Sequence, residues 1–273
     1  MKMTNLMEDT PGNSCCVHEH GLSFYFETKK HCYLLDFGAS KKTVENAEAL
    51  GIDLKKVDIG ILSHGHYDHS GGILPFIRVN YKAKIYMQKK ACKGYYNDKG
   101  DHYKYIGIAP EIMDLHQVCL LEGNKKVDDE LELFTNISGD KYPSKGNRTL
   151  MRKSQDTYVK DIFDHEQCAV LHVDGKDILF SGCAHNGVVN VMDTYRKLYD
   201  KEPDVMISGF HLNCSDGYEE ADYEMFRQIA NELKKTKTVF YTGHCTGQAA
   251  IDVMKPIMGE QLQVIRCGME MEI

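Results

Sequence analysis

The stretch ILSHGHYDHSGG, residues 61–72, decides how the rest of the sequence is interpreted. An apolar run ends here, and His64, His66, Asp68 and His69 follow within six positions. In an extended segment, residues i and i+2 point the same way, so His64 and His66 can bind one ion together. A turn at Tyr67 would then direct Asp68 and His69 toward a second position.

Two glycines, Gly71 and Gly72, follow the histidines and allow the backbone to pass close by without a side-chain clash. Neutral imidazole and carboxylate groups suit zinc, iron or manganese. Two such ions, about 3.5–4 Å apart, could share a bridging hydroxide. We therefore predict a site for two divalent metal ions, with zinc the most fitting metal. The scattered histidines are interpreted as surface or satisfied core residues: His18, His20, His31, His102 and His116.

Three later segments end a strand-like run with a histidine close to glycine. They are SGCAHNG with His185, SGFHLN with His211 and YTGHCTG with His244. Strand ends followed by tight turns are where a rigid scaffold presents side chains to a ligand. We predict that His185 and His244 bind metal. His211 is a candidate catalytic residue, which would hydrogen-bond the substrate or orient a metal ligand.

The order of the predicted elements indicates a mixed α/β fold. Residues 22–27 and 32–37 form a predicted hairpin, a helix follows that Gly51 ends, and residues 57–63 and 82–88 read as strands. A hairpin around Asp174 and Gly175 comes next. Helices at 188–200, 218–235 and 248–259 then alternate with strands at 203–210, 238–244 and 263–268. Such sheets need helices to cover them, so we expect a single domain over residues 1–273.

The range from about residue 90 to 160 has weaker periodicity. It mixes aromatic and charged residues in KGYYNDKGDHYKYIG and is rich in turn residues in DKYPSKGNRTLMRKS. We interpret it as a substrate-facing cover over one face of the domain, outside the core.

Composition excludes several classes of partner. The net charge of −7 comes from 40 acidic and 33 basic residues without a long basic stripe, which argues against nucleic-acid binding. No apolar segment approaches the ~20 residues that cross a bilayer, and the start of the sequence lacks a secretory h-region. The ten cysteines include no CxxC pair. We expect reduced thiols, a cytoplasmic location and a small-molecule substrate.

The motifs resemble those of the metallo-β-lactamase superfamily. SHGHYDHSGG is similar to its HxHxDH signature, and LLDFGAS before it resembles the family's strand that ends in D-x-G. The resemblance covers nearly the whole chain and implies an αββα sandwich with metals at one edge. It also implies that His64 and His66 serve the first metal with a third histidine. Asp68, His69 and His244 would serve the second.

SGCAHNGVVN, GFHLN and TGHCTG resemble the branch of 7,8-dihydropterin-6-methyl-4-(β-D-ribofuranosyl)aminobenzene-5'-phosphate synthases. The sequence also departs from the superfamily pattern. The usual HxxGH segment is replaced by DIFDHEQCAV, and Cys183 stands near the place of the aspartate that bridges the metals. His185 is the candidate for the third histidine, with His165 as its substitute. Cys183 is either a soft ligand or an inert buried thiol.

Three functions follow from these observations. The first is a hydrolase in which a metal-activated water attacks an ester, phosphoester or related anionic substrate, with Asp68 orienting the water. The amides at the start of the helix near Gly187 would suit a phosphorylated group. The second is a synthase that condenses a dihydropterin diphosphate with a ribofuranosylaminobenzene phosphate. The third is a metal-binding sensor or a redox protein without turnover. The sequence does not settle the oligomeric state.

Overall fold

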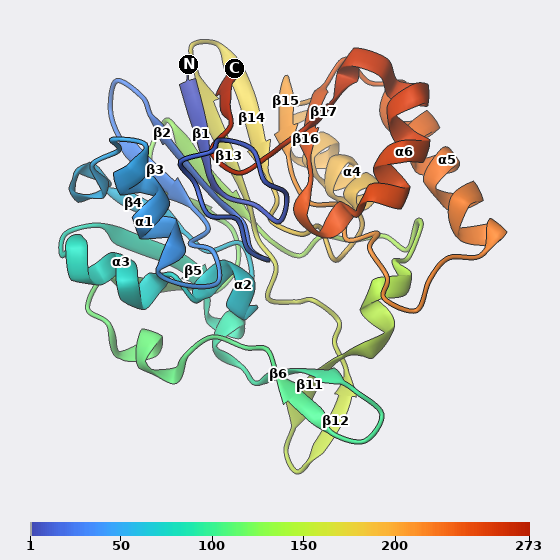
Figure 1. The fold of residues 1–273 in the computed structure, drawn as a ribbon, viewed down its shortest axis with the longest axis horizontal. Coiled ribbons are helices and arrows are strands. Elements are labelled where there is room, and N and C mark those ends of the chain that lie inside the picture. Colours follow the sequence, from blue (N-terminus) through green and yellow to red (C-terminus); the bar gives the residue numbers. More distant parts are fainter. Residues whose placement is uncertain (1) are drawn as a thin grey trace.

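The computed structural model describes residues 2–273. Two seven-stranded sheets pack face to face, and helices cover the outer face of each (Figure 1). The expected αββα sandwich is confirmed. Helices α1 and α3 cover the outer face of the first sheet. Helices α4, α5 and α6 cover the outer face of the second.

The first sheet combines antiparallel and parallel pairs. In spatial order it contains β18 (Glu270–Glu272), β1 (Lys2–Met7), β2 (Ser23–Glu27), β3 (Cys32–Leu35), β4 (Ile59–Ile61), β5 (Lys84–Gln88) and β8 (Val118–Leu121). The pairs from β18 to β3 are antiparallel, and those from β3 to β8 are parallel. The carboxyl ends of β3, β4 and β5 therefore lie at one edge.

The second sheet has the same mixture. In spatial order it contains β17 (Leu262–Val264), β16 (Val239–Thr242), β15 (Val205–Ile207), β14 (Lys176–Phe180), β13 (Cys168–Val173), β10 (Leu131–Phe134) and β9 (Lys125–Lys126). The strands from β14 to β17 are parallel, and β14, β13, β10 and β9 pair antiparallel. The carboxyl ends of β14, β15 and β16 thus share an edge as well.

Successive side chains of a strand point to opposite faces of the sheet, so each sheet has apolar core residues on both faces. In β3, Tyr33 and Leu35 point into the core between the sheets, whereas Leu34 packs against the helices outside. In β14, Phe180 lies between the sheets and Leu179 faces the helices. Each fully buried apolar side chain of this size contributes about 1.5–3 kcal/mol, so both faces stabilise the sandwich.

The helices show the spacing of apolar residues that a covered sheet requires. Their bounds are α1 (Lys42–Ala49), α2 (Tyr67–Ser70), α3 (Ile73–Val79), α4 (Val188–Tyr199), α5 (Glu220–Lys234) and α6 (Gln248–Met258). In α5 the buried residues Phe226, Ile229 and Leu233 recur at intervals of three and four, and Glu219 begins the helix with a capping box. Single 3₁₀ turns lie at Leu54–Lys56, Lys89–Cys92, Pro110–Asp114, Lys145–Thr149, His244–Thr246 and Gly259–Gln261.

A small third sheet lies beyond the sandwich (Figure 1). It contains, in spatial order, β12 (Thr157–Lys160), β11 (Leu150–Ser154), β6 (Tyr95–Asp98) and β7 (Tyr103–Tyr105). This sheet and its loops extend beyond the end of the two main layers. Within the range 90–160, β8 and β10 belong to the main sheets, and Leu131 and Leu133 are core residues. The expectation that the whole range lies outside the core is wrong for these strands, whose short runs of four residues gave little periodicity.

Outside the range 90–160, two strands were not predicted from sequence. β1 and β18 pair with each other and join the two ends of the described chain at the edge of the first sheet. Residues 263–268 were expected to form the last strand, but β17 ends at Val264 and the chain returns as β18. No helix in residues 2–273 is long and apolar enough to cross a membrane. All ten cysteines are free.

Candidate metal centre

The predicted site residues converge because their strands end at one place. His64 follows β4 of the first sheet, whereas His185, His211 and His244 follow the parallel strands β14, β15 and β16 of the second. A cavity of about 330 Å³ opens where these ends face one another, and its lining includes His66, His185 and His211. The two facing sheet edges thus bring together residues that are far apart in sequence.

Asp68, His69 and His244 form the first group of potential ligands. Nε2 of His69 lies 3.2 Å from Nε2 of His244, and both nitrogens lie within 3.5 Å of Oδ2 of Asp68, at 3.5 and 3.3 Å. Ligands held tetrahedrally at zinc bond lengths of about 2.0–2.1 Å would be about 3.3–3.4 Å apart. The three atoms therefore have the separation that a single zinc-sized ion requires.

The second group contains His64, Cys183 and His185, and the ring of His66 packs beside it. Nε2 of His64 lies 3.3 Å from Nε2 of His185. The ring of His66 packs 4.6 Å from that of His64 and 4.8 Å from that of His185. Its Nε2 is buried and has no hydrogen-bond partner in the described part of the chain. A buried imidazole nitrogen without a partner is costly unless it binds a ligand, so the group fits a cation.

The other ring nitrogen of most of these histidines is already engaged, which fixes the direction of Nε2. Nδ1 of His64 bonds Ser63 at 2.9 Å, and Nδ1 of His185 bonds Asn147 at 3.0 Å. Carboxylates hold the other two. Asp36 lies 2.6 Å from Nδ1 of His69, and Asp9 lies 2.6 Å from Nδ1 of His244. Such partners orient metal-binding imidazoles and increase their basicity.

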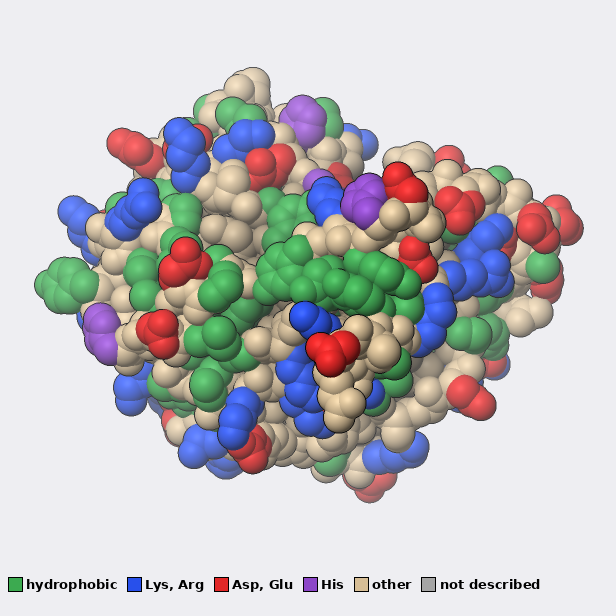
Figure 2. All heavy atoms as spheres, turned by 90° about the horizontal axis from the view of Figure 1, so that it is seen from below, with side chains coloured by type: hydrophobic (Ala, Val, Ile, Leu, Met, Phe, Trp, Pro, Cys, Tyr) green, Lys and Arg blue, Asp and Glu red, His purple; other side chains and the backbone are tan. Residues whose placement is uncertain are grey.

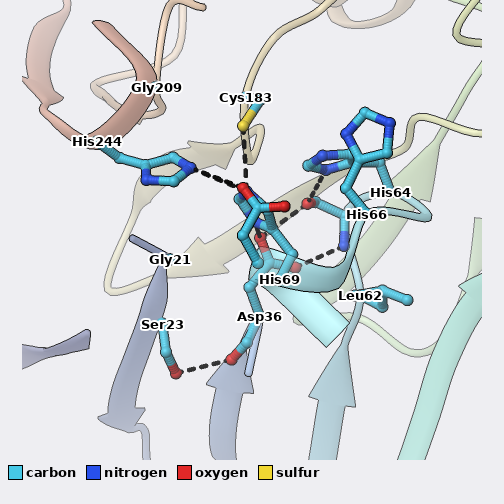
Figure 3. Close-up of polar contacts among 12 residues, drawn as sticks. Gly21, Ser23, Asp36, Leu62, His64, His66, His69, Cys183, Gly209 and His244 are labelled. Atoms are coloured by element: carbon cyan, nitrogen blue, oxygen red, sulfur yellow. Dashed lines mark hydrogen bonds and ion pairs between the residues drawn. The ribbon is translucent and has the colours of Figure 1, made fainter. Parts of the chain in front are cut away.

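Cys183 lies between the two groups (Figure 3). Its Sγ is 3.1 Å from Nε2 of His69. The sulfur also lies within 4.8 Å of the ligand atoms of Asp68 and His244, and likewise of His64 and His185. The thiol thus occupies the space in which a bridging ligand would be needed.

His165 is less suited than His185 to complete the second group. Its Nδ1 accepts a hydrogen bond from the Gly65 N–H at 3.0 Å, and its Nε2 bonds Asp161 at 3.1 Å. Both ring nitrogens are therefore engaged. The backbone that carries His185 is held in turn by buried Glu166, which accepts a hydrogen bond from the His185 N–H at 2.7 Å.

Three buried histidines of the site have lowered pKa values. Burial lowers the pKa of His64, His66 and His185, and neighbouring imidazoles lower it further. The pKa of His66 falls to about 3. These imidazoles are therefore neutral near pH 7, which is the form that binds metal.

The Asp68 and His244 pair behaves in the opposite way. Burial raises the pKa of Asp68, but the electrostatic interaction with His69 and the bond to His244 outweigh it and hold that pKa well below its usual range. Burial lowers the pKa of His244, yet Asp68 and Asp9 raise it well above its ordinary value. In the metal-free protein His244 is thus protonated, and a cation must displace that proton.

Two residues at the site were missed from sequence. His20, which we interpreted as a surface or satisfied core histidine, stacks on His244 at 4.7 Å between ring centroids. It bonds Asp9 at 2.8 Å and lies 3.3 Å from Asp68. Both His20 and Asp9 come from the segment after β1, and no motif marks them. His20 is exposed, as expected for a surface histidine, but it also belongs to the surroundings of the site.

The glycines of the first motif have the predicted purpose. A Cβ on Gly72 would lie 1.9 Å from the carbonyl oxygen of Phe37, and one on Gly71 would lie 2.1 Å from that of Ala39. The loop after β3 therefore packs directly on the backbone between α2 and α3. This contact holds Asp36, which follows β3, beside His69.

His211 lies beside the metal-binding groups. Its ring is 4.0 Å from that of His185, and both of its ring nitrogens are buried without a hydrogen-bond partner among the described residues. The start of α4 does not take the place that we expected for it. Gly187 lies against Lys141 and Asn190 and is not among the residues that line the cavity.

The cavity instead has basic side chains around it. Lys99, Lys104 and Lys145 line it together with Asn97 and Asn213. Lys145 is paired with Asp222 at 3.2 Å. Seen from the end that carries the third sheet, hydrophobic side chains form a band with lysine and arginine side chains beside it (Figure 2). The surroundings of the cavity therefore combine apolar and cationic groups.

Known proteins resemble this chain along most of its length. A 7,8-dihydropterin-6-methyl-4-(beta-D-ribofuranosyl)-aminobenzene-5'-phosphate synthase of Methanocaldococcus jannaschii is 27% identical over 98% of this chain and 95% of its own. An uncharacterized protein of the same organism is 27% identical over 91% of this chain and 92% of its own.

Solved structures show the same fold. The structure of Tm1679, described as a metal-dependent hydrolase of the beta-lactamase superfamily, superposes with a TM-score of 0.80 at 23% identity and covers 100% of this chain and 99% of its own. Zinc-bound PqqB of Methylobacterium extorquens has a TM-score of 0.59 at 10% identity, with both chains fully covered. The sequence profile of the metallo-beta-lactamase superfamily matches residues 18–244. The chain belongs to the metallo-β-lactamase superfamily.

Proposed function

We propose that this protein is a metal-dependent hydrolase that acts on an ester, a phosphoester or a related group of a small anionic substrate. The observation that carries the proposal is the pair of ligand groups, with Cys183 between them, at the edge of a cavity that a small molecule can enter. Most members of the superfamily are metal-dependent hydrolases. A sensor that only binds metal would not need a cavity with free basic side chains beside its ligands.

Six residues would hold two divalent ions, zinc most readily, with iron or manganese as alternatives: His64, His66 and His185 for one, and Asp68, His69 and His244 for the other. When bound, such ions supply an activated water and stabilise negative charge that develops on the substrate. Three protein ligands for each ion leave positions free for water and substrate, as in catalytic sites.

The remaining polar groups are assigned to the substrate. Asp68 is ionised, so its carboxylate can orient a water by accepting a hydrogen bond from the water O–H. His211 has unpartnered ring nitrogens beside the cavity and can bind the substrate or donate a proton to its leaving group. Lys99 and Lys104, which have no carboxylate partner within salt-bridge distance among residues 2–273, would attract an anionic group. We expect no nucleic-acid or membrane partner, and a cytoplasmic location.

The likeness to the Methanocaldococcus jannaschii synthase supports a second candidate activity. In that case a dihydropterin diphosphate would condense with a ribofuranosylaminobenzene phosphate and release diphosphate. The same basic side chains would then bind the diphosphate, and the ions would assist its departure. The two activities differ in their product, because hydrolysis consumes water and releases phosphate or an alcohol.

The test is a substrate panel with metal-loaded protein purified under anaerobic conditions. It contains nitrophenyl phosphate monoesters and diesters, carboxyl esters and the two pterin precursors together, with phosphate, alcohol and diphosphate measured separately. We expect turnover of an anionic ester that chelation abolishes and that His69→Ala lowers at least a hundredfold.

The matched control is His102→Ala, which removes an exposed histidine that is paired with Asp101. It should retain full activity. Release of diphosphate from the precursors without ester hydrolysis would replace the hydrolase by the synthase. Fully metal-loaded protein that turns over none of these compounds would favour a metal-binding sensor or redox protein.

A further inference from the structure

A third cluster of potential ligands lies beside the proposed two-metal centre. The sulfurs of Cys183 and Cys245 and a ring nitrogen of His211 all lie within 4.8 Å of one another. The three residues come from the loops that follow β14, β16 and β15. Cys245 and His211 are not among the six residues assigned to the two ions. The cluster therefore has donors that the proposed function leaves without a metal.

The backbone around the cluster makes room for the second sulfur. Gly209 follows β15, and a Cβ at this position would lie only 2.5 Å from Sγ of Cys245. Figure 3 shows Gly209 on the same side of the site as His244, the residue that precedes Cys245. The turn that carries Cys245 is held by Thr246, whose Oγ1 accepts a hydrogen bond from the Phe210 N–H at 2.9 Å. Cys245 is thus fixed against Cys183 by the packing of two loops.

The imidazole of this cluster is held ready for a ligand. His211 has a φ of +47°, a left-handed conformation that is uncommon for a residue with a side chain. Its carbonyl oxygen accepts a hydrogen bond from the Ser144 hydroxyl, which keeps the loop in place. Both ring nitrogens are buried and have no hydrogen-bond partner among residues 2–273. Buried polar atoms of native proteins are nearly always satisfied, so the ring is suited to bind something.

We propose that Cys183, Cys245 and His211 form a further metal site that takes a soft cation such as Cd²⁺, Cu⁺ or Zn²⁺. Two thiolates and one imidazole are donors that select soft and borderline ions over Mg²⁺ or Ca²⁺. The site shares Cys183 with the two-metal centre, so a thiophilic ion bound here competes for that sulfur. It also occupies His211, which would otherwise face the substrate.

The experiment uses Cd²⁺ as the probe with metal-stripped, reduced full-length protein. Bound cadmium is measured by equilibrium dialysis, thiolate-to-cadmium charge transfer by near-ultraviolet absorption, and the donor set by cadmium NMR, in which each sulfur donor shifts the resonance to higher frequency. We expect wild type to bind one more Cd²⁺ per chain than Cys245→Ser. The resonance from cadmium with two sulfur donors should vanish in that variant.

The controls separate this proposal from the proposed function. Cys119→Ser removes a thiol on β8, outside the metal-binding groups, and should behave as wild type. His211→Ala should weaken the extra equivalent at least tenfold while the Asp68, His69 and His244 group still binds, and it tests the site if Cys245→Ser fails to fold. Identical stoichiometry and spectra in wild type, Cys245→Ser and His211→Ala would overturn the proposal. His66→Ala and His69→Ala change only the two-metal centre, so retention of the two-sulfur cadmium resonance in both variants would support the further site, and its loss in both would count against a separate site.

Discussion

At the scale of single residues, the site depends on carboxylates that are not themselves predicted ligands. Asp36 accepts hydrogen bonds from the Ser63 N–H at 2.7 Å and the Ser63 hydroxyl at 2.7 Å, and it lies 2.6 Å from His69. It is fully buried. The Asp36 side chain thus connects the end of β3, the loop after β4 and α2. It orients the imidazole of His69 through their hydrogen bond.

Asp36→Asn tests this connection. The amide keeps the size of the side chain but removes the charge that orients the imidazole of His69, so we expect divalent-metal affinity to fall by about 10–100-fold. Competition with a chromophoric chelator measures the change. Asp128→Asn is the control, because Asp128 bonds His31 instead. Equal affinities in both variants would show that Asp36 has only a structural role.

The lowered pKa of the buried imidazoles predicts a dependence of stability on pH. Below about pH 6.5 the unfolded metal-free chain binds protons on His64, His66 and His185, whereas the folded chain does not until their lowered pKa values are reached. The free energy of unfolding should therefore fall with decreasing pH, by up to about 1.4 kcal/mol per pH unit for each group. For His66 this range extends from about pH 6.5 to about pH 3.

Urea unfolding of metal-free protein at a series of pH values measures this slope. In His66→Gln, the free energy of unfolding should change less steeply with pH, because the contribution of one histidine is removed. The exposed variant His102→Gln should have the slope of wild type. Since the pKa of His244 is raised, its contribution has the opposite sign: it is complete below about pH 6.5 and is lost as the pH rises through the raised value. A His66→Gln slope equal to that of wild type would contradict the assignment.

At the scale of elements, the features that could be predicted from sequence are those that local sequence patterns mark, such as histidines at the ends of strands. The HxHxDH motif and the Gly-flanked histidines stand at the ends of parallel strands, and parallel strands place their carboxyl ends at one edge. Asp9 and His20 could not be found in this way. The strand before them, β1, is fixed by pairing with β18, a contact between residues far apart in sequence that leaves no local signal.

Gly72→Ala tests the junction of α2 and α3. The added Cβ would lie 1.9 Å from a backbone oxygen that cannot rotate away, so the turn that carries Asp68 and His69 must move. We expect the free energy of unfolding to drop by about 1–3 kcal/mol, with weakened metal binding. Gly94→Ala is the matched control, since its nearest neighbour is the Tyr96 side chain at 3.1 Å. Equal denaturation midpoints would contradict this packing.

At the scale of the whole molecule, the third sheet extends beyond the sandwich at the end that holds the site (Figure 1). Lys99 and Lys104, on and beside its strands, line the cavity. Its role as a substrate-facing cover stays a prediction.

Limited proteolysis of native protein probes this arrangement. The first cuts should fall in the exposed turns near Gly100 and Gln155. The fragments should stay associated, because β5 pairs with β8 across a cut near Gly100 and β10 pairs with β13 across a cut near Gln155. Gel analysis with native mass spectrometry would show both. First cuts within residues 60–72 or 180–190 would mean that the metal-binding loops are the least stable part.

We propose above that this chain holds two divalent ions between its sheet edges. Metal analysis of anaerobically purified wild type, His66→Ala, His69→Ala and the control His102→Ala tests it most directly. Each of the first two changes removes one ligand from a different ion, so we expect two ions per chain in wild type and the control, and most bound metal lost from both site variants. Undiminished metal content in His66→Ala and His69→Ala would contradict the account.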